Sequence, residues 1–219
     1  QVELVAFSPF EPQNDFTSSL PLAFFTVELT NTSADPLDYT VAFSLTNPQQ
    51  EPSNIFFTED GLTGLVLGDR RPGPATADWG QLCLLTAGQP SSGQAYWYRG
   101  SWFDALNVFW QDFTRPGPLE QRRLEATPGQ DHGTICVHLA AGPGQKAKAG
   151  FVLAWYYPHY EKYWGREKDN PQKPLLRNWY ASQFSDAADL AHFGLAEQAK
   201  MESAAARFSQ ILFGSTLPR

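Results

Sequence analysis

The 219-residue chain has few cysteines, little clustered positive charge and no long apolar run. Its two cysteines, Cys83 and Cys136, each lie inside an apolar run typical of a buried strand, so we expect buried thiols rather than a disulfide. No apolar segment reaches 18 residues, which argues against a membrane-spanning helix. The formal net charge is −7, and tight basic pairs are rare, so a nucleic-acid partner is not expected.

The chain also lacks the motifs of the common catalytic chemistries. No GxSxG, P-loop or GxGxxG pattern occurs. The four histidines show no metal-ligand spacing with one another or with the cysteines: His132, His138, His159 and His192. We therefore expect neither a metal nor another cofactor. No motif assigns a compartment, and a cytoplasmic location is expected over a secreted one.

What the chain does have is alternation of apolar and polar residues between turns, which predicts a mainly β protein. A turn rich in Asn, Ser, Asp and Pro separates residues 22–31 from residues 39–46, and we predict that these two strands pair as an antiparallel hairpin. A short helix is predicted within residues 101–113. The predicted strands are residues 2–7, 22–31, 39–46, 79–86, 132–140 and 148–157, with a weaker hairpin at 55–67. Residues 87–94, rich in Gly, Ser and Pro, are predicted to be a loop. This pattern is typical of an antiparallel β-sandwich.

The strand that ends near residue 157 is apolar on both of its faces. Phe151, Leu153 and Trp155 alternate on one face, and the residues between them are apolar as well. Such a strand is predicted to be buried on both sides. Pro158 ends it, because proline lacks a backbone donor, and the residues that follow are dense in aromatic side chains.

The C-terminal part of the chain has a different character. Residues 175–213 lack proline and carry apolar side chains at three- and four-residue spacing, which predicts one long helix that Gly214 ends. A continuous helix of about 35 residues within this stretch would span roughly 50 Å at 1.5 Å per residue, longer than a small sandwich. We therefore divide the chain into a β-sandwich at residues 1–164 and a loop with a long helical linker at residues 165–219.

Four segments resemble the N-terminal domain of glycoside hydrolase family 116, which comprises β-glucosidases and the bile-acid β-glucosidase or non-lysosomal glucosylceramidase enzymes. The segments are FSPFEPQNDFTSSLPLAFFTVELTNTSADPLDYTVAFSLTN (7–47), GFVLAWYYPHYEKYWG (150–165), NWYASQFSDAADLA (178–191) and FGSTLP (213–218). The resemblance implies a sandwich, truncated at its start, that is followed in the family by an (α/α)6 barrel. It also implies that the barrel holds both catalytic carboxylates and binds a β-glucoside or glucosylceramide-like substrate.

The acidic residues of the chain agree with this division. Retaining glycoside hydrolysis needs two carboxyl groups about 5–5.5 Å apart, one of them with a raised pKa. Asp104 and Asp112 are eight residues apart on a predicted helix, about 12 Å along its axis, which is too far. Glu161, Glu167 and Asp169 alternate with basic residues, where solvated ion pairs are the default. No catalytic residue is assigned to this chain.

The aromatic residues near the boundary at residue 164 are the candidates for contacts with a catalytic domain. Three are expected to pack between the domains: Trp155, Tyr180 and Phe184. Four are expected at the rim of a sugar site: Tyr157, His159, Tyr160 and Trp164. Exposed apolar helix residues also favour self-association of the isolated chain.

Three classes of function remain open. The first is an accessory β-sandwich that orients the barrel of a β-glucosidase and lends loop residues to its substrate rim. The second is a stand-alone carbohydrate-binding module, which should have both termini in strands or tails rather than an overhanging helix. The third is a non-enzymatic interaction domain, which would need a sustained heptad repeat that residues 178–213 lack. We expect the first.

Overall fold

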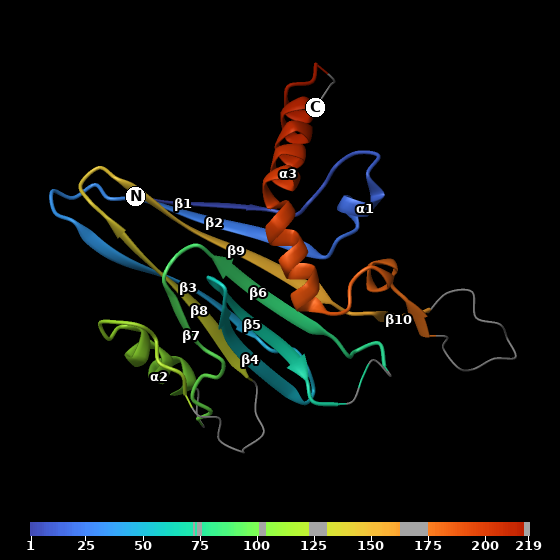
Figure 1. The fold of residues 1–219 in the computed structure, drawn as a ribbon, viewed down its shortest axis with the longest axis horizontal. Coiled ribbons are helices and arrows are strands. Elements are labelled where there is room, and N and C mark those ends of the chain that lie inside the picture. The colour runs from blue at the N-terminus through green and yellow to red at the C-terminus, as the bar shows by residue number, and fades with distance from the viewer. Residues whose placement is uncertain (72, 74–75, 101–103, 123–130, 163–174, 217–219) are drawn as a thin grey trace, which may run out of the picture.

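The computed structural model describes residues 1–71, 73, 76–100, 104–122, 131–162 and 175–216. Two antiparallel sheets face each other, and a helix covers the outer face of each sheet (Figure 1). The larger sheet has the order β1 (Val2–Phe7), β2 (Leu22–Thr30), β9 (Lys146–Tyr156), β6 (Gln81–Ala87), β5 (Leu62–Asp69), β4 (Pro52–Glu59). The smaller sheet has the order β3 (Leu37–Thr46), β8 (His132–Ala141), β7 (Ser91–Gln94).

The remaining elements are short apart from two helices. They are α1 (Asp15–Ser18), α2 (Asp104–Phe113), β10 (His159–Glu161), β11 (Leu175–Arg177), the 3-10 turn η1 (Trp179–Ser182) and α3 (Ala187–Phe213). Strands β10 and β11 pair antiparallel as a separate two-stranded sheet. The predicted β-sandwich with a long C-terminal helix is confirmed, as are the strands predicted along the chain and the helix within residues 101–113.

Strand β9 lies inside the larger sheet and is buried on both faces, as its two apolar faces predict. It pairs with β2 on one edge and with β6 on the other. Phe151 is 2 % exposed and packs into the core between the two sheets, with Ile135 and Val137 of β8. Val152 and Tyr156 belong to the second core, which lies between this sheet and α3. One strand therefore supplies side chains to both cores.

The predicted hairpin between β2 and β3 is wrong, because the two strands lie in different sheets. β2 pairs with β1 and β9, whereas β3 pairs with β8. The turn between them carries the chain from one sheet to the other, and hydrogen bonds of Asn31 fix it. The buried Asn31 donates from Nδ2 to the carbonyl of Ala141 (2.8 Å) and accepts from the backbone N–H of Ser33 (2.9 Å). Phe25 and Phe43 then meet edge to face across the core, with ring centroids 5.0 Å apart. Alternation marks which residues face inward, but not which strand lies next to them.

Two further expectations need correction. Residues 87–94 were expected to be a loop, yet they include β7, whose Gly and Ser residues give no strand signal. The helix predicted over residues 175–213 begins only at residue 187, after β11 and η1. The side chain of Asp186 caps it by accepting from the N–H of Asp189 (2.8 Å), which satisfies one of the free donors of the first turn. The helix has 27 residues, or about 40 Å.

Helix α3 lies close to the larger sheet at Gly194, which is buried. A Cβ atom added there would lie 3.0 and 3.1 Å from the two methyl carbons of Leu22 and 3.3 Å from a methyl carbon of Val152. The glycine thus lets the helix backbone lie close to β2 and β9. Beyond Met201 the helix extends away from the sheets (Figure 1), and its described residues there are largely exposed.

Replacing Gly194 with valine should therefore lower the free energy of unfolding by about 1–3 kcal/mol, because the added methyl groups overpack this contact. Ala206→Val on the exposed part of the same helix is the matched control and should cost less than about 1 kcal/mol. Urea denaturation of both variants measures the difference. Equal losses would show that close approach at residue 194 is unimportant.

Candidate functional site

Tyr157 and Tyr180 join the end of β9 to the 3-10 turn. The hydroxyl of Tyr180 donates to the carbonyl of Tyr157 (2.6 Å) and accepts from the N–H of the same residue (3.1 Å). The side-chain amide of Asn178 also donates to the Tyr157 carbonyl (2.7 Å). These side chains replace strand partners at the point where Pro158 interrupts the ladder.

The side chain of Tyr157 is committed to the interior of the fold. Its ring lies against Gly80, where an added Cβ would come within 2.4 Å of it. Its hydroxyl accepts from Nε2 of Gln49 (3.1 Å), and Gln49 accepts in turn from the N–H of Gly80 (3.2 Å). Burial raises the pKa of Tyr157 above its usual value. These contacts explain the residue structurally, and its place at a sugar rim stays a prediction.

The other predicted rim residues lie on or beside β10. His159 is half-buried, is in register with Arg177 of β11, and its Nδ1 atom has no hydrogen-bond partner within the described residues. Tyr160 is 40 % exposed. Trp164 lies outside the described residues. Tyr160 therefore lies at the surface of the β10–β11 sheet, whereas the Nδ1 atom of His159 is buried. Their place at a sugar rim stays a prediction.

The three residues predicted to pack between domains have different surroundings. Phe184 is 9 % exposed and belongs to the core under α3, where its carbonyl accepts from the hydroxyl of Tyr156 (3.1 Å). Tyr180 packs against the same core and lies edge-on to Tyr156. Trp155 is half-buried at the end of β9. Most of this aromatic surface is thus already covered by the chain itself.

Arginine side chains hold several described carboxyl groups in their ionised form. Arg71 binds both Asp69 (2.6 Å) and Asp78 (3.1 Å). Burial raises the pKa of Asp69, but hydrogen bonds from Arg71 outweigh it, and hydrogen bonds from Thr76 and Arg71 lower the pKa of Asp78. Every described carboxyl group that departs from its ordinary pKa departs downward. Neither Asp69 nor Asp78 therefore suits general-acid catalysis.

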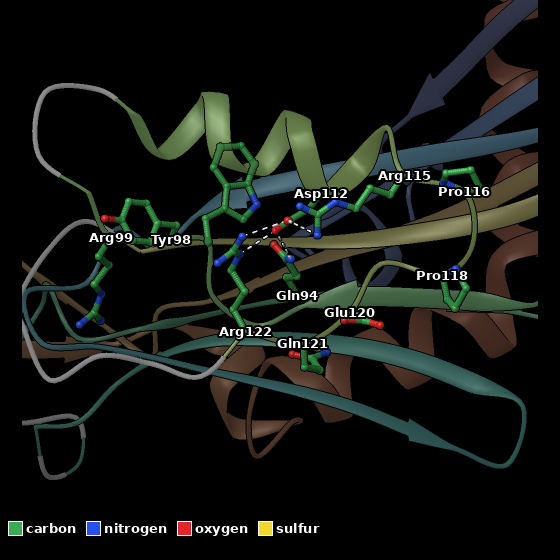
Figure 2. A pocket seen from close by; sticks show the side chains of 11 residues that line it. Gln94, Tyr98, Arg99, Asp112, Arg115, Pro116, Pro118, Glu120, Gln121 and Arg122 are labelled. Carbon is green, nitrogen blue, oxygen red and sulfur yellow. Dashed lines mark hydrogen bonds and ion pairs between the residues drawn. The ribbon is translucent and has the colours of Figure 1, made fainter.

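A polar cavity of about 460 Å³ lies between β7, α2 and the segment 115–122 (Figure 2). Gln94 of β7 and Asp112 of α2 line it. Nε and Nη2 of Arg122 donate to the two oxygens of Asp112 (2.6 and 2.9 Å), and Nε2 of Gln94 donates to Oδ2 (3.0 Å). Burial raises the pKa of Asp112, but these hydrogen bonds outweigh burial and hold it below its usual value.

Sequence reasoning missed this cavity. It treated Asp112 only as a candidate for catalysis and Arg122 as solvated charge, because the two are ten residues apart on either side of two prolines. Gln94 lay in a segment expected to be a loop. The only signal in the sequence is an uninformative one, a few polar residues next to Trp97 and Tyr98.

The part of the chain that the structure describes contains neither a cluster of potential metal ligands nor a membrane-spanning helix. No three His, Cys, Asp or Glu side chains there gather closely enough to hold a metal ion. None of the described helices has the length and apolar character needed to cross a membrane. The buried thiols of Cys83 and Cys136 are free, and burial raises the pKa of each to about 12, so neither is a reactive thiolate at neutral pH.

Comparison with known proteins gives one informative match. Residues 1–201 match the family model described as "beta-glucosidase 2, glycosyl-hydrolase family 116 N-term". No curated protein matches the chain. A solved structure described as "Putative kojibiose phosphorylase from human microbiome" aligns with 94 % of this chain at 10 % identity and a TM-score of 0.42. The chain spans 20 % of that structure's length, and a similarity this low carries no argument about function.

The Asp112 cluster makes a prediction about acid stability. Asp112→Asn should lower the free energy of unfolding by about 1–3 kcal/mol at pH 7, because charged hydrogen bonds from Arg122 are lost. Since the native pKa of Asp112 is depressed, its contribution is complete above the unfolded-state pKa of about 3.9 and is lost as the pH falls through the lower native value. The gap between wild type and variant should therefore narrow below about pH 4.

Urea denaturation at a series of pH values measures this gap. The exposed Asp38 offers the control, because Asp38→Asn removes an equal charge without breaking a cluster. A gap that stays constant from neutral pH down to pH values well below the unfolded-state pKa would contradict the role given to Asp112.

Proposed function

The chain belongs to glycosyl-hydrolase family 116, matching its N-terminal domain over residues 1–201, and we propose that it is the non-catalytic domain of a β-glucosidase-type enzyme. In this proposal residues 1–164 form the sandwich and residues 165–219 lead to a catalytic (α/α)6 barrel. The barrel supplies both catalytic carboxylates and binds a β-glucoside or glucosylceramide-like substrate. The sandwich orients the barrel and lends residues near β10 to the rim of the substrate site.

The observation that carries the proposal, beside the family match, is the exposed end of α3. Ile211, Leu212 and Phe213 are 63 %, 53 % and 81 % exposed, and they are consecutive, so apolar surface points in several directions from the helix. Exposed apolar side chains gathered at one helix end favour contact with another domain. A catalytic domain that follows the helix would cover it, and without that domain the same surface would favour self-association.

The lowered pKa values of several described carboxyl groups support a non-catalytic role. Hydrolysis with retention requires a nucleophile and a general acid about 5–5.5 Å apart with separated pKa values. The buried acidic groups here are instead held ionised by arginines, as Asp69 is by Arg71 and Asp112 by Arg122. Such groups stabilise the fold rather than donate protons.

The chain of residues 1–219 alone should therefore hydrolyse no β-glucoside. The measurement is release of an aryl leaving group, with the protein that also contains the catalytic domain as the positive control. Turnover by the isolated chain within about tenfold of that control, retained after repurification, would overturn the proposal.

Trp155 and His159, which lie on either side of the end of β9, give a second prediction. It is tested in the enzyme that contains the catalytic domain. His159→Ala should leave the melting temperature nearly unchanged and alter KM or kcat for substrates that differ in the leaving group, since a rim residue contacts the aglycone. Trp155→Ala is the comparison and should lower stability by less than the roughly 3–5 kcal/mol of a fully buried tryptophan, because it is half-buried. If both variants lose only stability and keep their kinetics, the two residues have a structural role and do not contact the substrate.

A further inference from the structure

The polar cavity lies on the opposite side of the sandwich from α3. Phe109 of α2 packs against Cys136 of β8, whose neighbours Ile135 and Val137 face the core between the sheets. Helix α2 therefore covers the outer face of the smaller sheet, whereas α3 covers the outer face of the larger one (Figure 1). A domain docked on α3 would leave the cavity open. A role of the cavity is therefore independent of the proposed function.

Gln94 forms part of the cavity wall and has an unused acceptor. Its side chain is 1 % exposed, and Nε2 must face Asp112 because the carboxylate can only accept. The other atom of the amide, Oε1, is buried and has no hydrogen-bond partner within the described residues. Buried polar atoms are nearly always paired, so this atom calls for a donor that the described residues do not supply.

The groups around Gln94 are held in place before any ligand binds. Asp112 accepts from both Arg122 and Gln94. Gln121 fastens its segment to β7 by donating to the carbonyl of Gly93 (2.8 Å) and accepting from the N–H of Ala95 (3.0 Å). A wall whose side chains are already ordered loses little entropy on binding a ligand.

The aromatic wall is equally fixed. Trp97 stacks on Phe109 with ring centroids 4.1 Å apart, and its indole N–H donates to Oγ1 of Thr134 (2.8 Å). Tyr98 lies under the guanidinium of Arg122, 6.0 Å from its ring centroid. Both rings line the cavity, so apolar ring surface lies beside the polar groups.

The charges of the cavity argue against an ionic ligand. Arg115 is largely exposed and reaches Asp112 only at 3.6 Å, so it can still donate, while the exposed Glu120 can still accept. An anion would meet Asp112, Glu120 and the Gln94 oxygen, and a cation would meet three arginines, Arg99, Arg115 and Arg122. A hydroxyl group donates and accepts at once, and therefore suits all of these groups.

We propose that this cavity binds a neutral saccharide, whose hydroxyl groups donate to Gln94 and Glu120 and accept from Arg115. Its volume of about 460 Å³ falls within the usual range of small-molecule sites, about 300–1,000 Å³. Apolar ring surface beside polar groups suits a sugar ring, which has both apolar C–H faces and hydroxyl groups.

Titration of the ¹⁵N-labelled chain followed by NMR tests this site. The probes are methyl β-D-glucoside, cellobiose and maltose, with inorganic phosphate and spermidine as the anionic and cationic comparisons. At least one saccharide should shift the Trp97 indole and Gln94 side-chain amide signals, with saturation at a Kd of about 1 mM or below. The two ionic probes should leave these signals in place.

Variants separate binding at the cavity from binding elsewhere. Gln94→Met should weaken saccharide binding about tenfold, and Arg115→Ala and Glu120→Ala should weaken it at an unchanged melting temperature. Leu106→Ala is the matched control, because Leu106 lies on α2, is 59 % exposed and does not line the cavity. The proposal is overturned if no saccharide shifts these signals at about 10 mM, if phosphate or spermidine binds more tightly, or if the exposed variants bind as wild type.

Discussion

Strand β9 hydrogen-bonds to β2 along one edge and to β6 along the other, and both of its faces are buried. Phe151 completes the core between the sheets, while Val152 and Tyr156 complete the core beneath α3. Because one strand belongs to both cores, the sandwich and the helix layer depend on each other. A substitution in β9 therefore affects the packing of both cores, including the packing of α3 on the sheet.

The end of β9 also fixes the positions of the aromatic residues around Pro158. Pro158 removes a backbone donor, and the hydroxyl of Tyr180 and the amide of Asn178 take over the neighbouring backbone groups of Tyr157. These hydrogen bonds tie the end of β9 to the residues that precede α3, so Tyr157, Asn178 and Tyr180 have a structural role. His159 and Tyr160 begin β10, and the side chain of Tyr160 is 40 % exposed.

The layered arrangement gives the molecule two separate outer surfaces. Helix α3 carries apolar residues at its far end, Ile211 to Phe213, which suit a partner domain. Helix α2 covers a cavity in which Asp112, Arg122 and Gln94 are held together by hydrogen bonds. An apolar surface and a polar one are suited to different partners, so the two sides of the sandwich can act without interfering.

The strands, the helix within residues 101–113 and the two-sided burial of β9 could be predicted from the sequence, because local alternation reports burial directly. The resemblance of four segments also indicated the family. The pairing of β2 with β9 rather than β3, the short strand β7 and the late start of α3 could not, since they depend on contacts between residues far apart in the chain. The same holds for the cavity: Gln94, Asp112 and Arg122 come together only when β7, α2 and the segment after its two prolines fold onto one another.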